Sequence, residues 1–231
     1  MTSQTRIRER INAGKLLVAP GIYDALTAKL AAGVGFEALY MTGYGTSASR
    51  RGLPDIGLLT MTEMLDNVRA IADAVEIPLI ADADTGYGNA VNVVRTVKEY
   101  ERAGAAAIHI EDQVWPKRCG HMRGKQVIPQ PEMVAKLRAA VDQRSSEDFI
   151  IIARTDALAV EGWDATLERA HAYVKAGADV IFVEALETVE QMERVPRLFD
   201  VPSLINMAPR TPDRPVAELE RMGYAIAIYP G

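Results

Sequence analysis

The sequence predicts an α/β protein whose eight parallel strands close into a (β/α)8 barrel of the TIM type. Short apolar runs alternate with longer segments of helical period along the whole chain, and eight such runs can be counted. The runs are continuously apolar, as expected for parallel strands that helices cover. Eight strands favour a closed barrel over an open, doubly wound sheet. No Gly-, Ser- or Pro-rich linker interrupts the pattern, so we expect one catalytic domain over residues 1–231.

The expected strands are rich in β-branched and other apolar residues. In order they read LLVA (16–19), FEALYMT (36–42), PLIADAD (78–84), AAAIHIED (105–112), FIIIART (149–155), DVIFVEA (179–185), PSLINMA (202–208) and YAIAIYP (224–230). Between them, helical spacing of apolar residues predicts helices over 25–32, 62–75, 90–103, 132–143, 165–176, 189–198 and 215–222. Gly33, Gly104, Gly177 and Gly223 follow four of these helices, where a left-handed residue ends the helix. The chain stops after the eighth strand, so the expected barrel lacks the eighth helix.

The composition is that of an ordinary soluble globular protein, with 48% hydrophobic and 25% charged residues. A net charge of −5 and the lack of a Lys/Arg run argue against a nucleic-acid partner. The N-terminal MTSQTRIRER has no apolar segment after its charges, and no apolar stretch approaches the ~20 residues of a membrane span. A single cysteine forms no internal disulfide, which fits the reducing cytoplasm. We therefore expect a cytoplasmic protein without a membrane partner, and the uncovered barrel flank favours a homo-oligomer.

Polar residues gather where the predicted strands end. The active site of such a barrel is built from the C-terminal ends of the strands and the loops after them. The residues at these ends are Thr42, Gly43, Tyr44, Asp82, Asp84, His109, Glu111, Asp112, Arg154, Asp156, Glu184 and Asn206. A set of charges on solvated loops is the alternative, but runs such as IIIART and VIFVEA bury a strand and place a charge directly at its end.

Six of these side chains are carboxylates: Asp82, Asp84, Glu111, Asp112, Asp156 and Glu184. So many negative charges at one barrel mouth repel one another, and a divalent cation relieves the repulsion. Oxygen ligands suit Mg²⁺ or Mn²⁺ and do not suit Zn²⁺. Asp82 and Asp84 alternate along one predicted strand, so both can point into the mouth. Their alternative role is in a tight turn, because Asp84-Thr85-Gly86 also suits one.

The loop after the fourth strand carries the only cysteine, Cys119. Three potentially cationic neighbours, Lys117, Arg118 and His121, surround it in the sequence, and such surroundings are expected to lower the pKa of a thiol. Gly120 and Gly124 would let the loop act as a lid, and its positive charge suits substrate carboxylates. The alternative is an exposed or half-packed cysteine without a role.

The remaining charged candidates are less specific. Arg154, at the end of a buried strand, serves either as a clamp for a substrate carboxylate or as a structural partner of Glu184. His109 inside the fourth strand and His171 on a helix are expected to be structural.

These residues resemble a known family. The runs LYMTGYGTSASRRGLPD, ADADTGYGN, HIEDQ, PKRCGH, ARTDA and VEA are similar, in order and over nearly the whole chain, to the isocitrate lyase and phosphoenolpyruvate mutase superfamily. The Cys-Gly-His loop is similar to the lyase branch, which includes 2-methylisocitrate and 2,3-dimethylmalate lyases. Thr42-Gly43-Tyr44 departs from the Ser-Gly-Gly that lyases of the family often have.

The resemblance implies roles for particular residues. Asp82 and Asp84 would form the Mg²⁺ site, with Glu111 and Asp55 bonding metal-bound water, so that Asp82, Asp84 and Glu111 are the candidate metal residues. Candidate substrate-binding residues are Thr42, Gly43, Tyr44, Gly120, Arg154, Glu184 and Asn206, and candidate catalytic residues are Cys119, Tyr40, Asp55 and His121. The family also exchanges a helix after the eighth strand between subunits, which implies a homotetramer of helix-swapped dimers.

The chemistry that fits these residues is cleavage of a 2-hydroxy di- or tricarboxylic acid into a 2-oxo acid such as pyruvate and a second carboxylic acid. Cys119 would act as general acid toward the departing fragment, and Tyr40 or a metal-linked carboxylate as the base. Decarboxylation or hydrolysis of oxaloacetate and phosphonate P–C chemistry are alternatives at the same site. A non-catalytic, oxo-acid-binding barrel is the alternative of another class.

Overall fold

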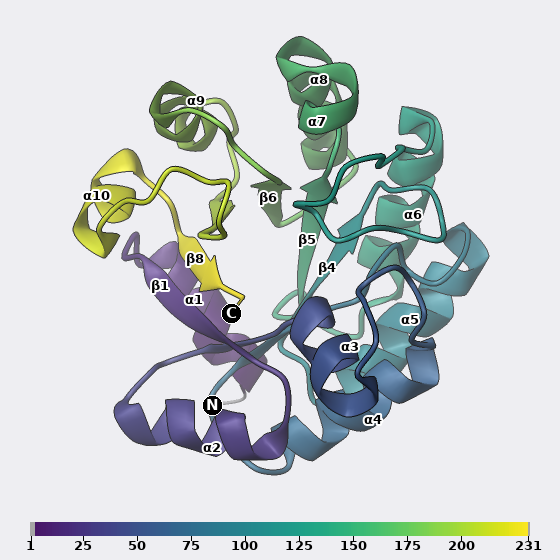
Figure 1. The fold of residues 1–231 in the computed structure, drawn as a ribbon, viewed down its shortest axis with the longest axis vertical. Helices are drawn as coiled ribbons and strands as arrows, with labels where there is room; N and C mark the ends of the chain where they lie inside the picture. The colour runs from purple at the N-terminus through teal and green to yellow at the C-terminus, as the bar shows by residue number, and fades with distance from the viewer. Residues whose placement is uncertain (1–2, 231) are drawn as a thin grey trace.

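Eight parallel strands close into a barrel in the order of the sequence (Figure 1). The structure, a computed structural model, describes residues 3–230. The strands are β1 (Leu17–Ile22), β2 (Leu39–Met41), β3 (Leu79–Asp82), β4 (Ala107–Glu111), β5 (Ile150–Thr155), β6 (Val180–Val183), β7 (Ser203–Asn206) and β8 (Ile226–Tyr229). Pairing of β1 with β8, from Leu17 opposite Ile226 to Pro20 opposite Tyr229, completes the ring. The expected fold class and all eight strands are confirmed.

Helices surround the strands, and all seven expected helices are present (Figure 1). They are α2 (Ala25–Val34), α4 (Met61–Ala72), α5 (Ala90–Arg102), α6 (Gln130–Gln143), α8 (Trp163–Lys175), α9 (Val189–Arg194) and α10 (Val216–Met222). The 3-10 turn η1 (Val195–Arg197) continues α9. Three further helices were not expected from the sequence: α1 (Ser3–Asn12), α3 (Gly43–Arg51) and α7 (Leu158–Glu161).

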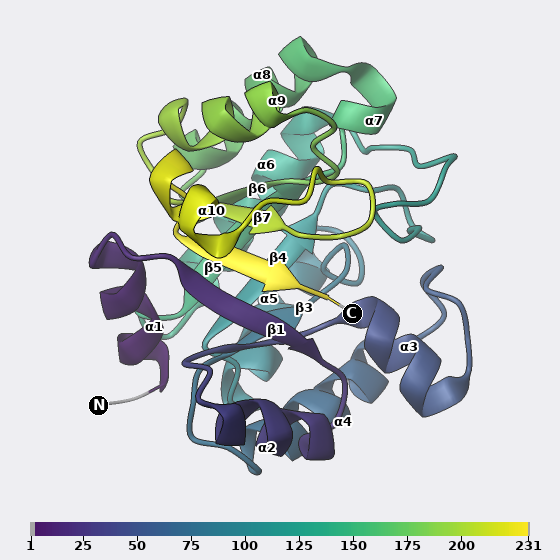
Figure 2. The same ribbon diagram turned by 60° about the vertical axis from the view of Figure 1, so that its left-hand side comes forward.

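The two unexpected helices at the N-terminal part of the chain lie at opposite ends of the barrel. Figure 2 shows α1 beside the start of the strands and α3 where the strands end. Ile7 and Ile11 of α1 are buried and belong to the same apolar cluster as the inward-facing strand residues. Helix α1 therefore covers the base of the barrel, and α3 lies at the end that carries the polar residues.

The core has two parts. One lies between the strands and the helices and includes Ile22, Leu39 and Met41, and the other fills the barrel interior and includes Ile80 and Phe182. Side chains alternate along each strand, so one set faces the helices and the other faces the barrel axis. Above the inner set, the strand ends present polar side chains to the mouth.

Three of the four expected helix-ending glycines have the left-handed conformation: Gly104, Gly177 and Gly223, with φ between 97° and 103°. The expectation for Gly33 is wrong, because α2 runs on to Val34 and Gly35 ends it at a φ of 103°. No helix between residues 3 and 230 is long and apolar enough to span a membrane.

Candidate active site

A cavity of about 240 Å³ opens at the C-terminal ends of the strands. Its walls come from most of the strand ends and from the loop after β4. The lining residues are Tyr40, Thr42, Tyr44, Asp55, Asp82, Cys119, Gly120, His121, Arg154, Glu184, Asn206, Ala208, Pro209 and Pro230. Of the candidate residues, Gly43, Asp84 and Glu111 do not line it, although each contacts a residue that does or the loop that covers it. The single thiol and Asp82 thus face one shared space.

Asp82 is held at the end of β3 by backbone donors. The amide of Gly43 donates to one carboxylate oxygen at 3.1 Å, and the amide of Asp84 donates to the other at 2.9 Å. Burial alone would raise the pKa of Asp82, but the positive charges of Lys117 and Arg154 help to hold it below its usual value. Asp82 therefore stays ionised.

Asp84 reaches the site through a turn, which corrects the expectation that it shares a strand with Asp82. Strand β3 ends at Asp82, and Asp84 has a left-handed φ of 46°. The amide of Gly86 donates to the carbonyl of Ala83 at 2.9 Å, which closes the turn. A role in the turn therefore does not exclude a role of Asp84 in the metal site proposed from the sequence, because the turn places the Asp84 amide on the Asp82 carboxylate.

Lys117 is a site residue to which the sequence assigned no specific role. Its Nζ lies 2.5 Å from Asp55 Oδ1 and 2.8 Å from Asp84 Oδ1, and its side chain is only 3% exposed. Burial would lower the pKa of Lys117, but Asp84, Asp82 and other carboxylates raise it well above its usual range. A charged lysine from the loop therefore compensates part of the negative charge at the mouth.

Arg154, at the end of β5, compensates most of the rest. It lies 3.2 Å from Glu111, 2.9 Å from Asp156 and 3.3 Å from Glu184, and it also lines the cavity. The structural pairing with Glu184 is thus present, and the position also leaves Arg154 able to meet a substrate carboxylate.

Asp112 is not part of this cluster. Its carboxylate accepts hydrogen bonds from Thr155, Tyr173 and the amide of Asp156, and it does not line the cavity. Neighbouring residues of a strand point to opposite sides, so Glu111 and Asp112 cannot both face the mouth.

Glu111 supplies the test of whether a cation fits. It is fully buried, burial raises its pKa well above the usual range, and neither of its carboxylate oxygens accepts a hydrogen bond. Arg154 lies 3.2 Å from one of these oxygens as an ion pair without hydrogen-bond geometry, so donors from water held by a cation would still lower the cost of burying this carboxylate. No three His, Cys, Asp or Glu side chains between residues 3 and 230 are grouped so as to hold a metal alone. Mg²⁺ commonly takes one or two carboxylates and keeps its water, so Asp82 and Asp84 with Glu111 behind them fit it.

Cys119 does not have the lowered pKa expected from its sequence neighbours. Burial of the half-buried thiol raises its pKa above the usual value, and the amide of His121, Arg154 and Lys117 do not offset this. Arg118 is exposed, with its backbone bonded to the Gln113 side chain at 2.8 and 3.0 Å. The charge of Arg118, the residue before Cys119, is therefore exposed to solvent. Cys119 carries its proton at neutral pH.

This protonation state predicts how Cys119 reacts. The alkylation rate of Cys119 by iodoacetamide should rise with pH to a midpoint above that of glutathione measured in parallel, because only the thiolate reacts. Since the chain has one cysteine, the label reports on this site alone. A midpoint below that of glutathione would restore the expectation of a lowered pKa.

Gly120 allows the loop to approach the strand ends. A Cβ at this position would lie 2.5 Å from an Arg154 nitrogen and 2.7 Å from the Glu184 carboxylate. We expect Gly120→Ala to lower kcat/KM by about 100-fold, because displacing a catalytic group by about 1 Å has an effect of that size. Gly33→Ala is the matched control, since an added Cβ there meets no atom within 4 Å and activity should not change. Steady-state kinetics of the two variants decide between local displacement and a general effect of alanine.

His121 and Asn206 both contact Glu184. His121 Nε2 lies 3.2 Å from one carboxylate oxygen, and the Asn206 amide donates to the other at 3.2 Å. Burial would raise the pKa of Glu184, but Arg154 and His121 lower it. The loop and strands β5, β6 and β7 therefore share one polar network.

Tyr40 lines the cavity and contacts His109, which does not line it. The Tyr40 hydroxyl lies 2.9 Å from His109 Nε2, which is 3.5 Å from Asp82. Burial lowers the pKa of His109 to about 4 and raises that of Tyr40 well above its usual value. Both groups are therefore neutral at pH 7, which fits a structural His109 and disfavours Tyr40 as a base.

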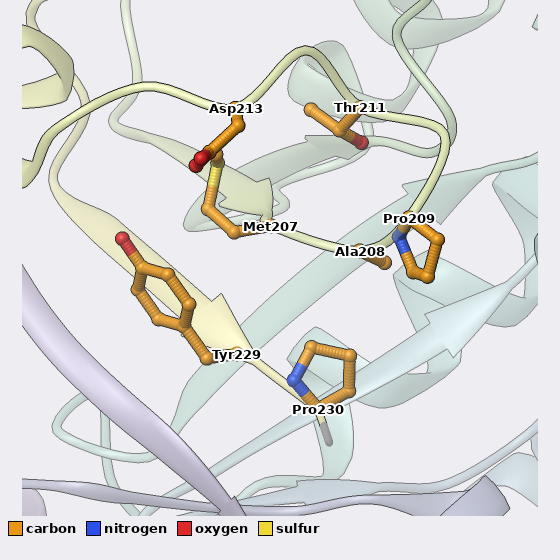
Figure 3. Close-up of a pocket in the computed structure, with 7 residues that line it drawn as sticks. All are labelled: Met207, Ala208, Pro209, Thr211, Asp213, Tyr229 and Pro230. Atoms are coloured by element: carbon orange, nitrogen blue, oxygen red, sulfur yellow. The ribbon is translucent and has the colours of Figure 1, made fainter.

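A second hollow, of about 460 Å³, adjoins the cavity (Figure 3). Ala208, Pro209 and Pro230 line both spaces, and the second space has mostly apolar walls that include Met207 and Tyr229. Figure 3 shows Thr211 and Asp213 on the loop across from Tyr229. The site is thus bounded by charge on the side of β3 to β6 and by apolar groups on the side of β7 and β8.

Comparison with known proteins places this geometry in a family. Residues 7–231 match the family model described as phosphoenolpyruvate phosphomutase. The chain is 54% identical to 2,3-dimethylmalate lyase of Eubacterium barkeri, over 100% of this chain and 80% of the relative. It is 48% identical to 2-methylisocitrate lyase of Aeropyrum pernix, over 97% of this chain and 72% of the relative.

Solved structures agree. A crystal structure of 2,3-dimethylmalate lyase superposes with a TM-score of 0.96 at 43% identity, covering 100% of this chain and 79% of that one. A structure of phosphonopyruvate hydrolase in complex with oxalate and Mg²⁺ superposes with a TM-score of 0.90 at 35% identity, covering 99% of this chain and 80% of that one. The chain therefore belongs to the phosphoenolpyruvate mutase and isocitrate lyase superfamily, and it is an enzyme of the carbon–carbon lyase kind within it.

Proposed function

We propose that the protein cleaves a 2-hydroxy di- or tricarboxylic acid of the 2-alkylmalate or 2-methylisocitrate type, releasing a 2-oxo acid such as pyruvate and a second carboxylic acid. The observation that carries the proposal is the shared cavity, in which a protonated thiol, Cys119, faces Asp82 and Arg154. The two relatives named as lyases of such acids support it.

Mg²⁺ is the proposed cofactor, with Mn²⁺ as a substitute. Asp82 and Asp84 would hold it, and Glu111 and Asp55 would bond its water. When bound, it would polarise the carboxylate and 2-oxygen of the substrate and so favour formation of the oxo acid. The oxalate and Mg²⁺ complex of a superfamily member supports this choice.

The chain's own residues bind and orient the substrate. Arg154 and the segment Thr42-Gly43-Tyr44 would hold substrate carboxylates, Asn206 would bond a further oxygen, and Gly120 keeps the loop close to them. His121 would hold Glu184 in place. The apolar walls beside Pro209 and Pro230 suit the hydrocarbon part of the substrate.

Two proton movements accompany the cleavage. The 2-hydroxyl loses its proton, the electron pair of the carbon–carbon bond passes to the departing fragment, and that fragment takes a proton from the Cys119 thiol. Tyr40 keeps its own proton because its pKa is raised, so a carboxylate of the cavity is the better base. Asp55, which lines the cavity, is our candidate for that role.

A substrate panel tests the proposal. Pyruvate release should be measured by a coupled assay from 2-methylisocitrate, 2,3-dimethylmalate and oxaloacetate, with Mg²⁺ and with EDTA. We expect release from one of the first two acids, lost in EDTA. Pyruvate from oxaloacetate alone would indicate a decarboxylase, and pyruvate from none would leave hydrolytic, phosphonate or non-catalytic roles.

We further propose a cytoplasmic homo-oligomer, with a tetramer as the expected assembly. Light scattering on the purified protein would give its mass directly, and a monomer at micromolar concentration would contradict the proposal.

A further inference from the structure

The loop between β4 and α6 is closed at its base by its own backbone. Gln113 and Val127 form an antiparallel bridge, and the amide of Val114 donates to the carbonyl of Gln126 at 2.9 Å. The tip with Cys119, Gly120 and His121 lies over the cavity. The bridge at the base does not involve the tip, so other contacts hold the tip over the cavity.

Contacts from the barrel side and from the loop itself hold the tip. The amide of Cys119 donates to the carbonyl of Asp55 at 3.0 Å, and His121 lies 3.2 Å from Glu184. A third contact comes from within the loop, where Lys125 Nζ donates to the carbonyl of Gly120 at 2.6 Å. Lys125 does not line the cavity, so it can be changed without removing a cavity-lining side chain.

Lys125 is anchored to the barrel through Asp156. Its Nζ also lies 2.8 Å from Asp156 Oδ1, the lysine side chain is 2% exposed, and the aspartate is fully buried. Arg154 holds the same carboxylate through two nitrogens, at 2.9 and 3.2 Å. A buried lysine with two oxygen partners, one of them charged, is a strong and directional contact.

The contact made by Lys125 lies one residue away from Cys119, the proposed general acid. Gly120 lies so close to Arg154 and Glu184 that a Cβ would overlap both. Because Gly120 directly follows Cys119 and has little room to move, a shift of the Gly120 carbonyl also shifts Cys119.

We propose that Lys125 is a positioning residue, which holds the Gly120 carbonyl against Asp156 and so keeps the Cys119 thiol at the reacting centre. Removing its ammonium group leaves the Gly120 carbonyl without its donor, while Arg154 still neutralises Asp156. The tip then opens more often and Cys119 is more exposed. The turnover part of this inference rests on the proposed function of Cys119, whereas the opening of the loop does not.

The test compares Lys125→Met with the native protein. We expect iodoacetamide to alkylate Cys119 about tenfold faster in the variant, because more of the population is open. We expect kcat to fall about 100-fold with KM changed less than about threefold, because the substrate-binding residues stay in place. Native alkylation kinetics in folded Lys125→Met would overturn the proposal.

Arg144→Met is the matched control. Arg144, which directly follows α6, forms a largely buried ion pair with Asp179, which directly precedes β6 at the end of the barrel opposite the loop, so its loss should lower the melting temperature without changing alkylation. Faster alkylation in this control, equal to that of Lys125→Met, would show general loosening and reject the positioning role.

A second variant covers poor folding of the first. Lys125→Gln keeps a shorter, neutral donor and should give an alkylation rate between those of the native protein and Lys125→Met; a native rate contradicts the proposal. If Cys119→Ser retains turnover, the proposed function fails, while the alkylation rates still decide the role of Lys125.

Discussion

Replacing Cys119 with serine should lower kcat by about 1,000-fold, within the range that general acids contribute. The serine hydroxyl has nearly the size of the thiol but is a far weaker acid, so the departing carbanion fragment loses its proton donor. Cys119 contacts Asp55 only through its backbone amide, so Mg²⁺ and pyruvate should bind as before. Isothermal titration with both ligands and a pyruvate-release assay would measure the two effects separately.

The matched control is Met122→Ser. Met122 lies on the same loop, is 42% exposed and does not line the cavity. The activity of Met122→Ser should therefore stay within about twofold of native. Near-normal turnover of Cys119→Ser would refute the acid role outright.

Asp84→Asn should produce the second large effect, a loss of Mg²⁺ affinity and of turnover. The substitution keeps shape and removes one negative charge, and asparagine tolerates the left-handed φ of 46° at this position. We expect Mg²⁺ affinity to fall by about 100-fold and turnover with it, because a dication held by two carboxylates loses one of them. Titration calorimetry or Mn²⁺ paramagnetic resonance would measure the affinity without any assay of activity.

Burial raises the pKa of Asp84 to about 6, so acid should mimic this variant. Below pH 6 the native side chain takes up a proton, and metal affinity should decline in the native protein more steeply than in Asp84→Asn. Asp213→Asn is the control, since Asp213 lies beside the adjoining hollow and its loss should leave Mg²⁺ affinity unchanged. Unchanged affinity in Asp84→Asn would place the metal elsewhere.

The fold was predictable because its signals are local. Continuous apolar runs such as IIIART identify buried strands, and helical spacing identifies the helices between them. Helix α3 was missed because its sequence, GYGTSASRR, has two glycines and few strong helix formers. It depends on its surroundings: Thr42 caps it by accepting from the amide of Gly45 at 3.2 Å, and a Cβ at Gly43 would overlap Asp82.

The sequence indicated many of the residues that line the cavity, but it did not indicate how their charges and pKa values are balanced. Strand ends indicated the residues that line the cavity, because parallel strands deliver their termini to one face. Lys117 and Lys125 received no separate roles, since lysines on a loop usually face solvent and their burial depends on contacts far away in sequence. The same distance effect reversed the pKa expected for Cys119, because proximity in sequence to Arg118 is not proximity in space.

Among residues 3–230, Lys117 and Lys125 of the loop and Arg154 of the barrel wall form ion pairs with carboxylates at the mouth. Any outward excursion of that segment therefore strips positive charge from Asp55, Asp84 and Asp156 together. The uncovered mouth has a more negative electrostatic potential than the covered one and attracts small cations such as the proposed Mg²⁺. The extent of loop opening and the rate of ligand entry should consequently depend on ionic strength. Charge as well as ligand size therefore controls access to the barrel.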